Sequence, residues 1–152
     1  EGEGSEVKQC CYSCMMYELL LDLGIVGDAG SKIIHKIIIL LKEYAKRSHM
    51  GDYQLKDIYL NIANGDKHEA KNLDQRVRRT VAKALNNIAH QGIDDYGNEN
   101  FQRYSSALFD FGEIRQEMNC IIGKSCYHGK INAKKFIEGL ILLGTRNFDK
   151  TI

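Results

Sequence analysis

A long stripe of apolar residues constrains the fold of this chain more than any other feature. The stripe lies between residues 71 and 90 and recurs at helical spacing: Leu73, Val77, Val81, Leu85 and Ile88. That spacing predicts one long amphipathic helix packed against a core along one side. At about 100° per residue, a polar and basic set falls together on the opposite side: Asn72, Arg76, Arg79, Lys83 and Asn86.

The composition favours a single helical domain. The chain has 152 residues, enough to bury a sizeable core, and it contains no Pro and no Trp. Its apolar residues recur mostly at the spacing that is typical of helices. We therefore expect an all-α fold, a compact multi-helix domain over residues 10–152, and we interpret the acidic, glycine-rich residues 1–9 as the remnant of a linker.

The charge is balanced overall but uneven along the chain. The formal net charge is +1 at pH 7, yet residues 71–83 contain five Lys or Arg against one Asp. A local basic excess of this kind is typical of a surface that meets an anionic partner. An ordinary amphipathic helix with a solvated face is the simpler interpretation, and only the surroundings of the helix can separate the two.

The sequence predicts a cytoplasmic protein without a membrane partner. Its first residues are acidic and lack the basic region of a signal peptide. The longest apolar run, Ile37–Leu41, is far shorter than the ~20 residues that a membrane span needs. The five cysteines are odd in number and have no regular disulfide spacing, which favours reduced thiols.

Glycines and capping residues divide the chain into expected helices. Ser31 and Asn132 are expected N-caps, while Gly65 and Gly92 are expected to end helices in the left-handed conformation. Tyr44 is expected to complete the buried face of the second helix, before a polar turn at residues 48–53. The expected helices cover approximately residues 7–23, 31–47, 54–63, 73–90, 98–109, 113–122 and 133–143.

Two consecutive expected helices form a candidate helix-turn-helix. Residues 54–63 would be the positioning helix, and residues 73–90 would be the reader helix with its basic face outward. The expected connection from Asn64 to Asn72 is longer than the turn of about 3–4 residues in the simplest form of this motif.

No enzyme is predicted, because two motifs that suggest catalysis are incomplete. Residues 110–112 spell the Asp-Phe-Gly triplet of protein kinases, but the glycine-rich loop, the strand lysine and the catalytic-loop Asp are missing. Residues 123–125 resemble the end of a phosphate-binding loop, yet the position that needs the first glycine of that loop is Met118. The sequence therefore offers no catalytic residue and implies no cofactor.

A zinc site is a weaker alternative. Its potential ligands are Cys11, Cys14, Cys126 and His128. Zinc-binding cysteine pairs lie on tight turns, whereas the first pair here falls inside an expected helix. Small buried thiols are the simpler interpretation, so no metal ligand is predicted.

Four segments of the chain carry a family resemblance. They are Leu20–Ile25, Arg76–Val81, Ser106–Phe111 and Gly129–Ile137. Together they resemble the YcbB-type (GlnL-like) output domain of bacterial response regulators over roughly residues 10–143, and the last two segments are the most specific. The resemblance implies an effector domain of six or more helices that binds promoter DNA through its helix-turn-helix.

The same resemblance implies partners outside this chain. In such regulators an N-terminal receiver domain is phosphorylated by a sensor histidine kinase, and this controls dimerisation and DNA binding. The partners expected on that basis are double-stranded promoter DNA, a second copy of the chain on the DNA, the receiver domain with its kinase, and RNA polymerase. Regulators of this type are associated with glutamine utilisation.

A weaker likeness extends to the DNA-binding domain of the sporulation master regulator. It is carried by a Leu-Gly-Ile sequence before a long helix, and by Arg76, Val77 and Arg79 followed by Ala84. Position 78 is Arg where the sporulation-type motif has an acid. Base preference is therefore not transferred between the two families.

The predicted interface divides into residues that read bases and residues that hold phosphates. Arginine can form two hydrogen bonds with guanine, and asparagine or glutamine can form two with adenine. The predicted base-reading set is therefore Asn72, Gln75, Arg76 and Arg79. The set predicted to contact phosphates is Lys67, Lys71, Arg78, Thr80 and Lys83.

Two other functions remain open. An RNA-binding antiterminator-type output domain would use the same basic face. A protein-interaction module would instead use the apolar region around Phe109 and Phe111, and its binding would be insensitive to salt.

Overall fold

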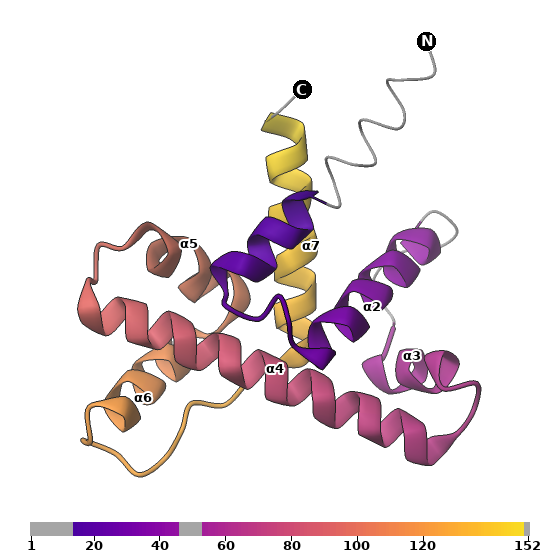
Figure 1. Cartoon of the computed structure of the whole chain (residues 1–152), viewed down its shortest axis with the longest axis horizontal. Coiled ribbons are helices and arrows are strands. Elements are labelled where there is room, and N and C mark those ends of the chain that lie inside the picture. Colours follow the sequence, from indigo (N-terminus) through magenta and orange to yellow (C-terminus); the bar gives the residue numbers. More distant parts are fainter. Residues whose placement is uncertain (1–13, 46–52, 151–152) are drawn as a thin grey trace.

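The computed structural model describes residues 14–45 and 53–150, with side chains described up to residue 145. Every regular element in this part of the chain is a helix, which confirms the expected all-α fold (Figure 1). Residues 14–22 are helical, and the labelled helices are α2 (Ala29–Ala45), α3 (Leu55–Ile62), α4 (Lys67–Asp94), α5 (Glu99–Leu108), α6 (Phe111–Ile121) and α7 (Ala133–Lys150). No helix in the described ranges is both long and apolar enough to span a bilayer.

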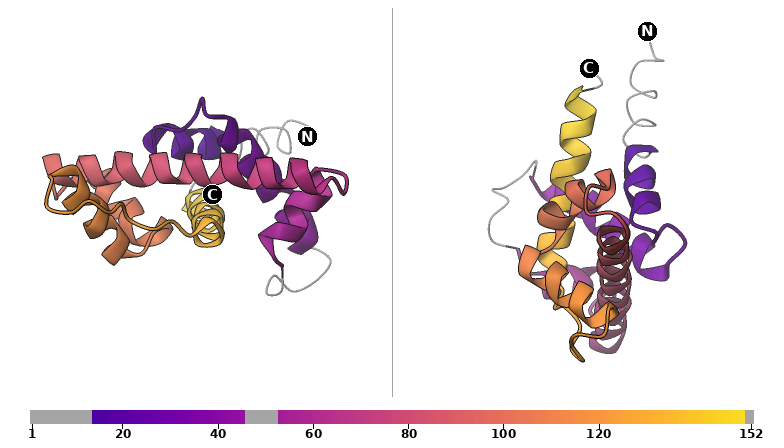
Figure 2. Two further views of the ribbon diagram at one scale, coloured as in Figure 1. Left: turned by 90° about the horizontal axis from the view of Figure 1, so that it is seen from below. Right: turned by 90° about the vertical axis from the view of Figure 1, so that its left-hand side faces the viewer.

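Helix α4 is the axis around which the other helices pack. It runs across the molecule, with α2 and α3 against its N-terminal half and α5 and α6 against its C-terminal half (Figure 1). Figure 2 (left) shows segment 14–22 and α7 on opposite sides of α4. The predicted apolar stripe is buried in full: Leu73, Val77, Val81, Leu85 and Ile88.

The turn before α4 is shorter than the sequence suggested. Gly65 adopts a φ of 85°, the left-handed conformation expected of it, and its N–H donates to the carbonyl of Leu60 at 2.8 Å. The Asp66 carboxylate then accepts hydrogen bonds from the N–H groups of His68 and Glu69 and forms the N-cap. Helix α4 therefore begins at Lys67, and the connection is residues 63–66 rather than residues 64–72. The expectation of a long connection is wrong, because residues 67–72 belong to α4.

The expected glycine at the end of α4 is instead part of the helix. Gly92 is buried, and α4 continues to Asp94. A Cβ atom at Gly92 would lie 2.2 Å from a ring carbon of Phe101. Gly92 therefore allows α5 to pack closely on α4, and it does not cap the helix.

Helix α2 also differs from its expected form. Ser31 is not the N-cap, because α2 begins at Ala29 and the Ser31 hydroxyl donates to the carbonyl of Ile25 at 2.5 Å. Tyr44 is 54% exposed, so it does not belong to the buried face. The expected continuation of this helix to residue 47 and most of the turn at 48–53 lie outside the described residues, as does the expected helix before residue 14.

The C-terminal third forms the expected helices, but part of the expected interaction surface around Phe109 and Phe111 is buried. The Asn132 side chain accepts from the N–H of Lys135 at 3.1 Å and caps α7, which extends well beyond its expected end at residue 143. Phe109 is buried against Phe136, with ring centroids 5.6 Å apart. Of the two aromatic residues expected on an interaction surface, only Phe111 is exposed.

The Glu117 carboxylate joins α6 to α4 and to the loop before α7. It accepts hydrogen bonds from the Asn86 side chain at 3.0 Å, the N–H of Gly129 at 2.8 Å and His128 Nδ1 at 3.1 Å. Burial raises the pKa of Glu117, but these hydrogen bonds outweigh it and hold the pKa below its usual range. Because its folded-state pKa is depressed, its stabilisation is complete above the unfolded-state pKa of about 4.3 and is lost as the pH falls through the folded-state value.

Glu117→Gln is expected to lower the free energy of unfolding at pH 7 by about 1–3 kcal/mol, because charge-assisted hydrogen bonds are lost in a buried site. Urea unfolding measured at about pH 7 and about pH 3 checks this. The difference between the variant and the original chain should shrink at the lower pH, which lies below the unfolded-state pKa of about 4.3. An equal difference at both pH values would show that Glu117 acts by packing rather than by charge.

Candidate nucleic-acid interface

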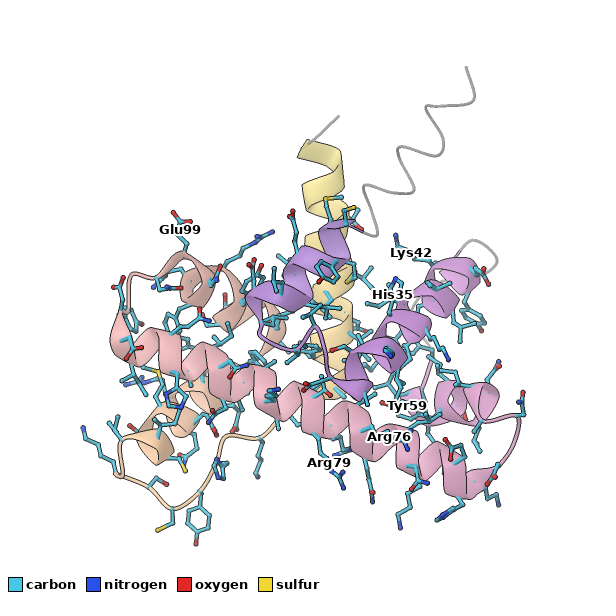
Figure 3. All side chains as sticks on the ribbon, viewed as in Figure 1. His35, Lys42, Tyr59, Arg76, Arg79 and Glu99 are labelled. Atoms are coloured by element: carbon cyan, nitrogen blue, oxygen red, sulfur yellow. The ribbon has the colours of Figure 1, made fainter. Side chains whose placement is uncertain are left out.

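The predicted base-reading residues lie together on the N-terminal half of α4. Gln75, Arg76 and Arg79 are exposed, and Asn72 is partly exposed. Figure 3 shows Arg76 and Arg79 projecting from α4 rather than into the core. Within the described ranges, neither arginine has an ion pair or a side-chain hydrogen bond. Both guanidinium groups are therefore available to a partner.

Predicted phosphate-contacting residues flank this face on both edges. Lys83 lies on the edge nearest the segment before α2, where its Nζ is 3.0 Å from Asp28 Oδ1. Arg78 lies on the opposite edge, and its Nε is 3.1 Å from Asp74 Oδ1. Exposed ion pairs of this kind contribute only about 0–1 kcal/mol. A phosphate group can therefore replace either carboxylate at little cost.

Thr80 of the predicted phosphate-contacting set and Asn86 of the predicted polar face are turned toward neighbouring helices. Thr80 is only 3% exposed, and a Cβ atom at Gly30 of α2 would lie 2.2 Å from its hydroxyl oxygen. The Thr80 hydroxyl thus faces α2 and cannot reach a phosphate in this conformation, which corrects that expectation. Asn86 donates to the Glu117 carboxylate and is also turned toward a neighbouring helix.

A basic cleft lies along the edge of α4 that carries Arg78. It has a volume of about 690 Å³ and is formed by α3, the N-terminal half of α4 and the start of α7. Besides the predicted Lys67, Lys71 and Arg78, two further cations line it, Lys56 of α3 and Lys134 of α7. Neither residue could be placed at this edge from the sequence, because only the packing of α3 and α7 against α4 brings them there.

The cleft wall also contains a buried phenol. Tyr59 is 3% exposed, and its hydroxyl has no hydrogen-bond partner among the described residues. Burial, together with the Asp74 carboxylate and opposed by Arg78, raises the pKa of Tyr59 to about 12. The hydroxyl is therefore neutral at pH 7 and keeps its proton to donate.

The residues of the alternative zinc site do not form a metal centre in the described ranges. There, no group of three or more His, Cys, Asp or Glu side chains is placed to hold a metal ion. Cys14 and Cys126 are exposed, His128 contacts Glu117 and lies 3.7 Å from Cys120 Sγ, and Cys11 is outside the described residues.

Comparison with known proteins identifies related sequences. The family model described as the YcbB domain matches residues 15–140. The chain is 29% identical over 140 residues to the transcriptional regulatory protein GlnL of Bacillus subtilis (strain 168). That alignment covers 82% of this chain and 44% of the relative, so the chain spans less than half of the relative's length. No solved structure matches the chain.

Proposed function

This chain belongs to the YcbB domain family, and on that premise we propose that it is the DNA-binding output domain of a two-component response regulator. Its activity in this proposal is sequence-specific binding of double-stranded promoter DNA, without catalysis. The name of the Bacillus subtilis relative, a transcriptional regulatory protein, supports a role in transcription. The resemblance to GlnL-like regulators adds glutamine utilisation as the proposed physiological setting.

One observation supports DNA binding more strongly than any other. Arg76 and Arg79, which form no ion pair or side-chain hydrogen bond with the described residues, are exposed on the second helix of a helix-turn-helix candidate. The turn between α3 and α4 is residues 63–66, which is the length that the simplest form of the motif has. In this motif the N-terminal part of the second helix enters the major groove and contacts base edges.

The exposed residues of α4 match the chemistry of base edges. Arg76 and Arg79 can each donate two hydrogen bonds to O6 and N7 of guanine, while Asn72 and Gln75 can pair with N6 and N7 of adenine. The cations on the two edges of α4 would bind phosphates and fix the position of the helix in the groove. They are Lys67, Lys71, Arg78 and Lys83.

The proposal extends to the assembly on DNA. A single helix-turn-helix contacts few base pairs, so two copies on neighbouring half-sites are needed for a specific site. A receiver domain phosphorylated by a sensor histidine kinase would control this pairing, and contact with RNA polymerase would follow at the promoter. These partners rest on the family resemblance rather than on the geometry.

Competition between duplex DNA and structured RNA tests the proposed function. A labelled duplex bound to the chain is titrated with unlabelled duplex and, separately, with a structured RNA of equal length. We expect the duplex to compete at a lower concentration, because an α-helix can enter the major groove of B-form DNA but not that of an A-form helix. Stronger competition by the RNA would favour the antiterminator-type function.

Lys83→Ala is expected to weaken binding to all duplexes by the same factor and to reduce the slope of log K against log salt by about 1. A salt titration on a preferred and a scrambled duplex measures both effects. Asp28→Asn is the control, because it removes the carboxylate that Lys83 contacts and should leave the slope intact. An unchanged slope in Lys83→Ala would remove Lys83 from the interface.

A further inference from the structure

The cleft between α3, α4 and the start of α7 concentrates positive charge. Its lining includes five cations, Lys56, Lys67, Lys71, Arg78 and Lys134, and one carboxylate, Asp74. The chain as a whole carries 21 Lys and Arg against 20 Asp and Glu. An excess of four positive charges around one concave surface is therefore not a consequence of composition, and such a surface attracts anions.

Most of this charge is not neutralised within the protein. Lys56, Lys67 and Lys71 form no ion pair with the described residues. Lys134 Nζ donates to the carbonyl of Tyr53 at 3.1 Å and lies 4.6 Å from the centre of the Tyr53 ring. Those contacts hold Lys134 at the cleft without cancelling its charge.

Uncharged groups at the cleft also favour the binding of an anion. The first residues of α7 line it, and the first turn of α7 contains no acidic side chain. The N-terminus of a helix carries partial positive charge on its free N–H groups. Tyr59 also lines the cleft, and its hydroxyl is buried behind that surface without a hydrogen-bond partner among the described residues. An anion with several acceptor oxygens would satisfy this arrangement.

The position of the cleft indicates where that anion comes from. The cleft lies on the α4 edge that carries Lys71 and Arg78, beside the face of Arg76 and Arg79. When a helix occupies the major groove, the two sugar-phosphate backbones pass along its two edges. Lys83 marks one edge, and the cleft extends along the other.

We propose that this cleft binds a phosphate of the DNA backbone, and that Lys56 and Lys134 contact the same duplex whose bases α4 reads. The proposal rests on the proposed DNA-binding function and enlarges its interface from one helix to three elements. Lys56 is the more informative position, because it is exposed and forms no ion pair with the described residues, whereas Lys134 contacts Tyr53.

The test measures salt-dependent binding of the chain to a preferred and a scrambled duplex. Lys56→Gln and Lys134→Gln are each expected to lower the slope of log K against log salt by about 0.9, which corresponds to about fivefold weaker binding at about 0.15 M salt on both duplexes. The matched control is Lys124→Gln, an exposed lysine that follows the end of α6. The control should bind like the original chain.

The possible results separate this proposal from the proposed function. If the original chain does not bind duplex DNA, the proposed function fails. If Arg79→Ala weakens binding but Lys56→Gln and the double Lys56→Gln/Lys134→Gln variant keep the original slope, only the cleft proposal is overturned. Titration with inorganic phosphate completes the test. If Lys56→Gln abolishes phosphate binding but keeps the original slope of log K against log salt for duplex DNA, the cleft binds a free phosphate compound. That result would overturn the proposal that it binds a phosphate of the DNA backbone.

Discussion

Arg79→Ala is expected to weaken binding to the preferred duplex by about 1–3 kcal/mol, or roughly 5- to 150-fold, and to bind a scrambled duplex with little change. The Arg79 side chain is exposed and forms no ion pair or side-chain hydrogen bond with the described residues, so Arg79→Ala removes no such interaction from the folded protein. Its loss should act only in the complex, where a bidentate hydrogen bond to guanine disappears. Equilibrium titration of both duplexes at one fixed salt concentration measures the change.

Arg115→Ala is the matched control for that experiment. Arg115 is also an exposed arginine without a described partner, but it lies on α6. The Arg115→Ala variant loses the same charge as Arg79→Ala and should keep its affinity for both the preferred and the scrambled duplex. If Arg79→Ala weakens both duplexes equally, Arg79 contacts phosphate rather than bases. If it weakens neither, the exposed face of α4 is not the reading surface.

Gly30→Ala is expected to destabilise the protein by about 1–3 kcal/mol and lower Tm by roughly 2–4 °C for each kcal/mol. A Cβ atom at Gly30 would lie 2.6 Å from the carbonyl oxygen of Arg76 and 2.7 Å from Thr80 Cβ. The carbonyl belongs to the backbone of α4, which cannot move aside without shifting the helix. DNA binding should fall as well, because the displaced turn of α4 carries Arg76.

Gly112→Ala provides a control at the same position in another helix. Gly30 is the second residue of α2 and Gly112 is the second residue of α6, but nothing lies within 4 Å of a Cβ atom at Gly112. Alanine should therefore stabilise α6 by up to about 1 kcal/mol through its helix propensity. Thermal unfolding of both variants measures the two changes in Tm, which should have opposite signs. A stabilising Gly30→Ala would mean that α2 and α4 pack less closely than described.

The parts of the fold that depend on local pattern could be predicted from the sequence. The apolar stripe from Leu73 to Ile88 predicted both the existence and the buried face of α4. The true start of α4 also left a local signal, since Asp66 is followed at the third position by Glu69, a spacing typical of a helix N-terminus. The glycine-containing segment before Asp66 favours a longer loop, so two local signals conflict at this point of the sequence.

Features that depend on tertiary contact could not be predicted. Gly92 has the sequence context of a terminal glycine, and only the Phe101 ring shows that it is a packing position. Thr80 lies near the border of the apolar stripe, and the closeness of Gly30 decides that it is buried. Lys56 and Lys134 are far apart in the sequence and face one cleft only because α3 and α7 pack on the same part of α4.

The most direct test of the DNA-reading face is selection from a randomised duplex library. The original chain and a double Arg76→Ala/Arg79→Ala variant are carried through the same rounds of binding and sequencing. We expect the original chain to enrich one recurring motif. The double variant, still folded by circular dichroism, should bind weakly without enriching it. The same motif enriched by both proteins, or no motif enriched by the original chain, would contradict the assignment of α4 as the reading helix.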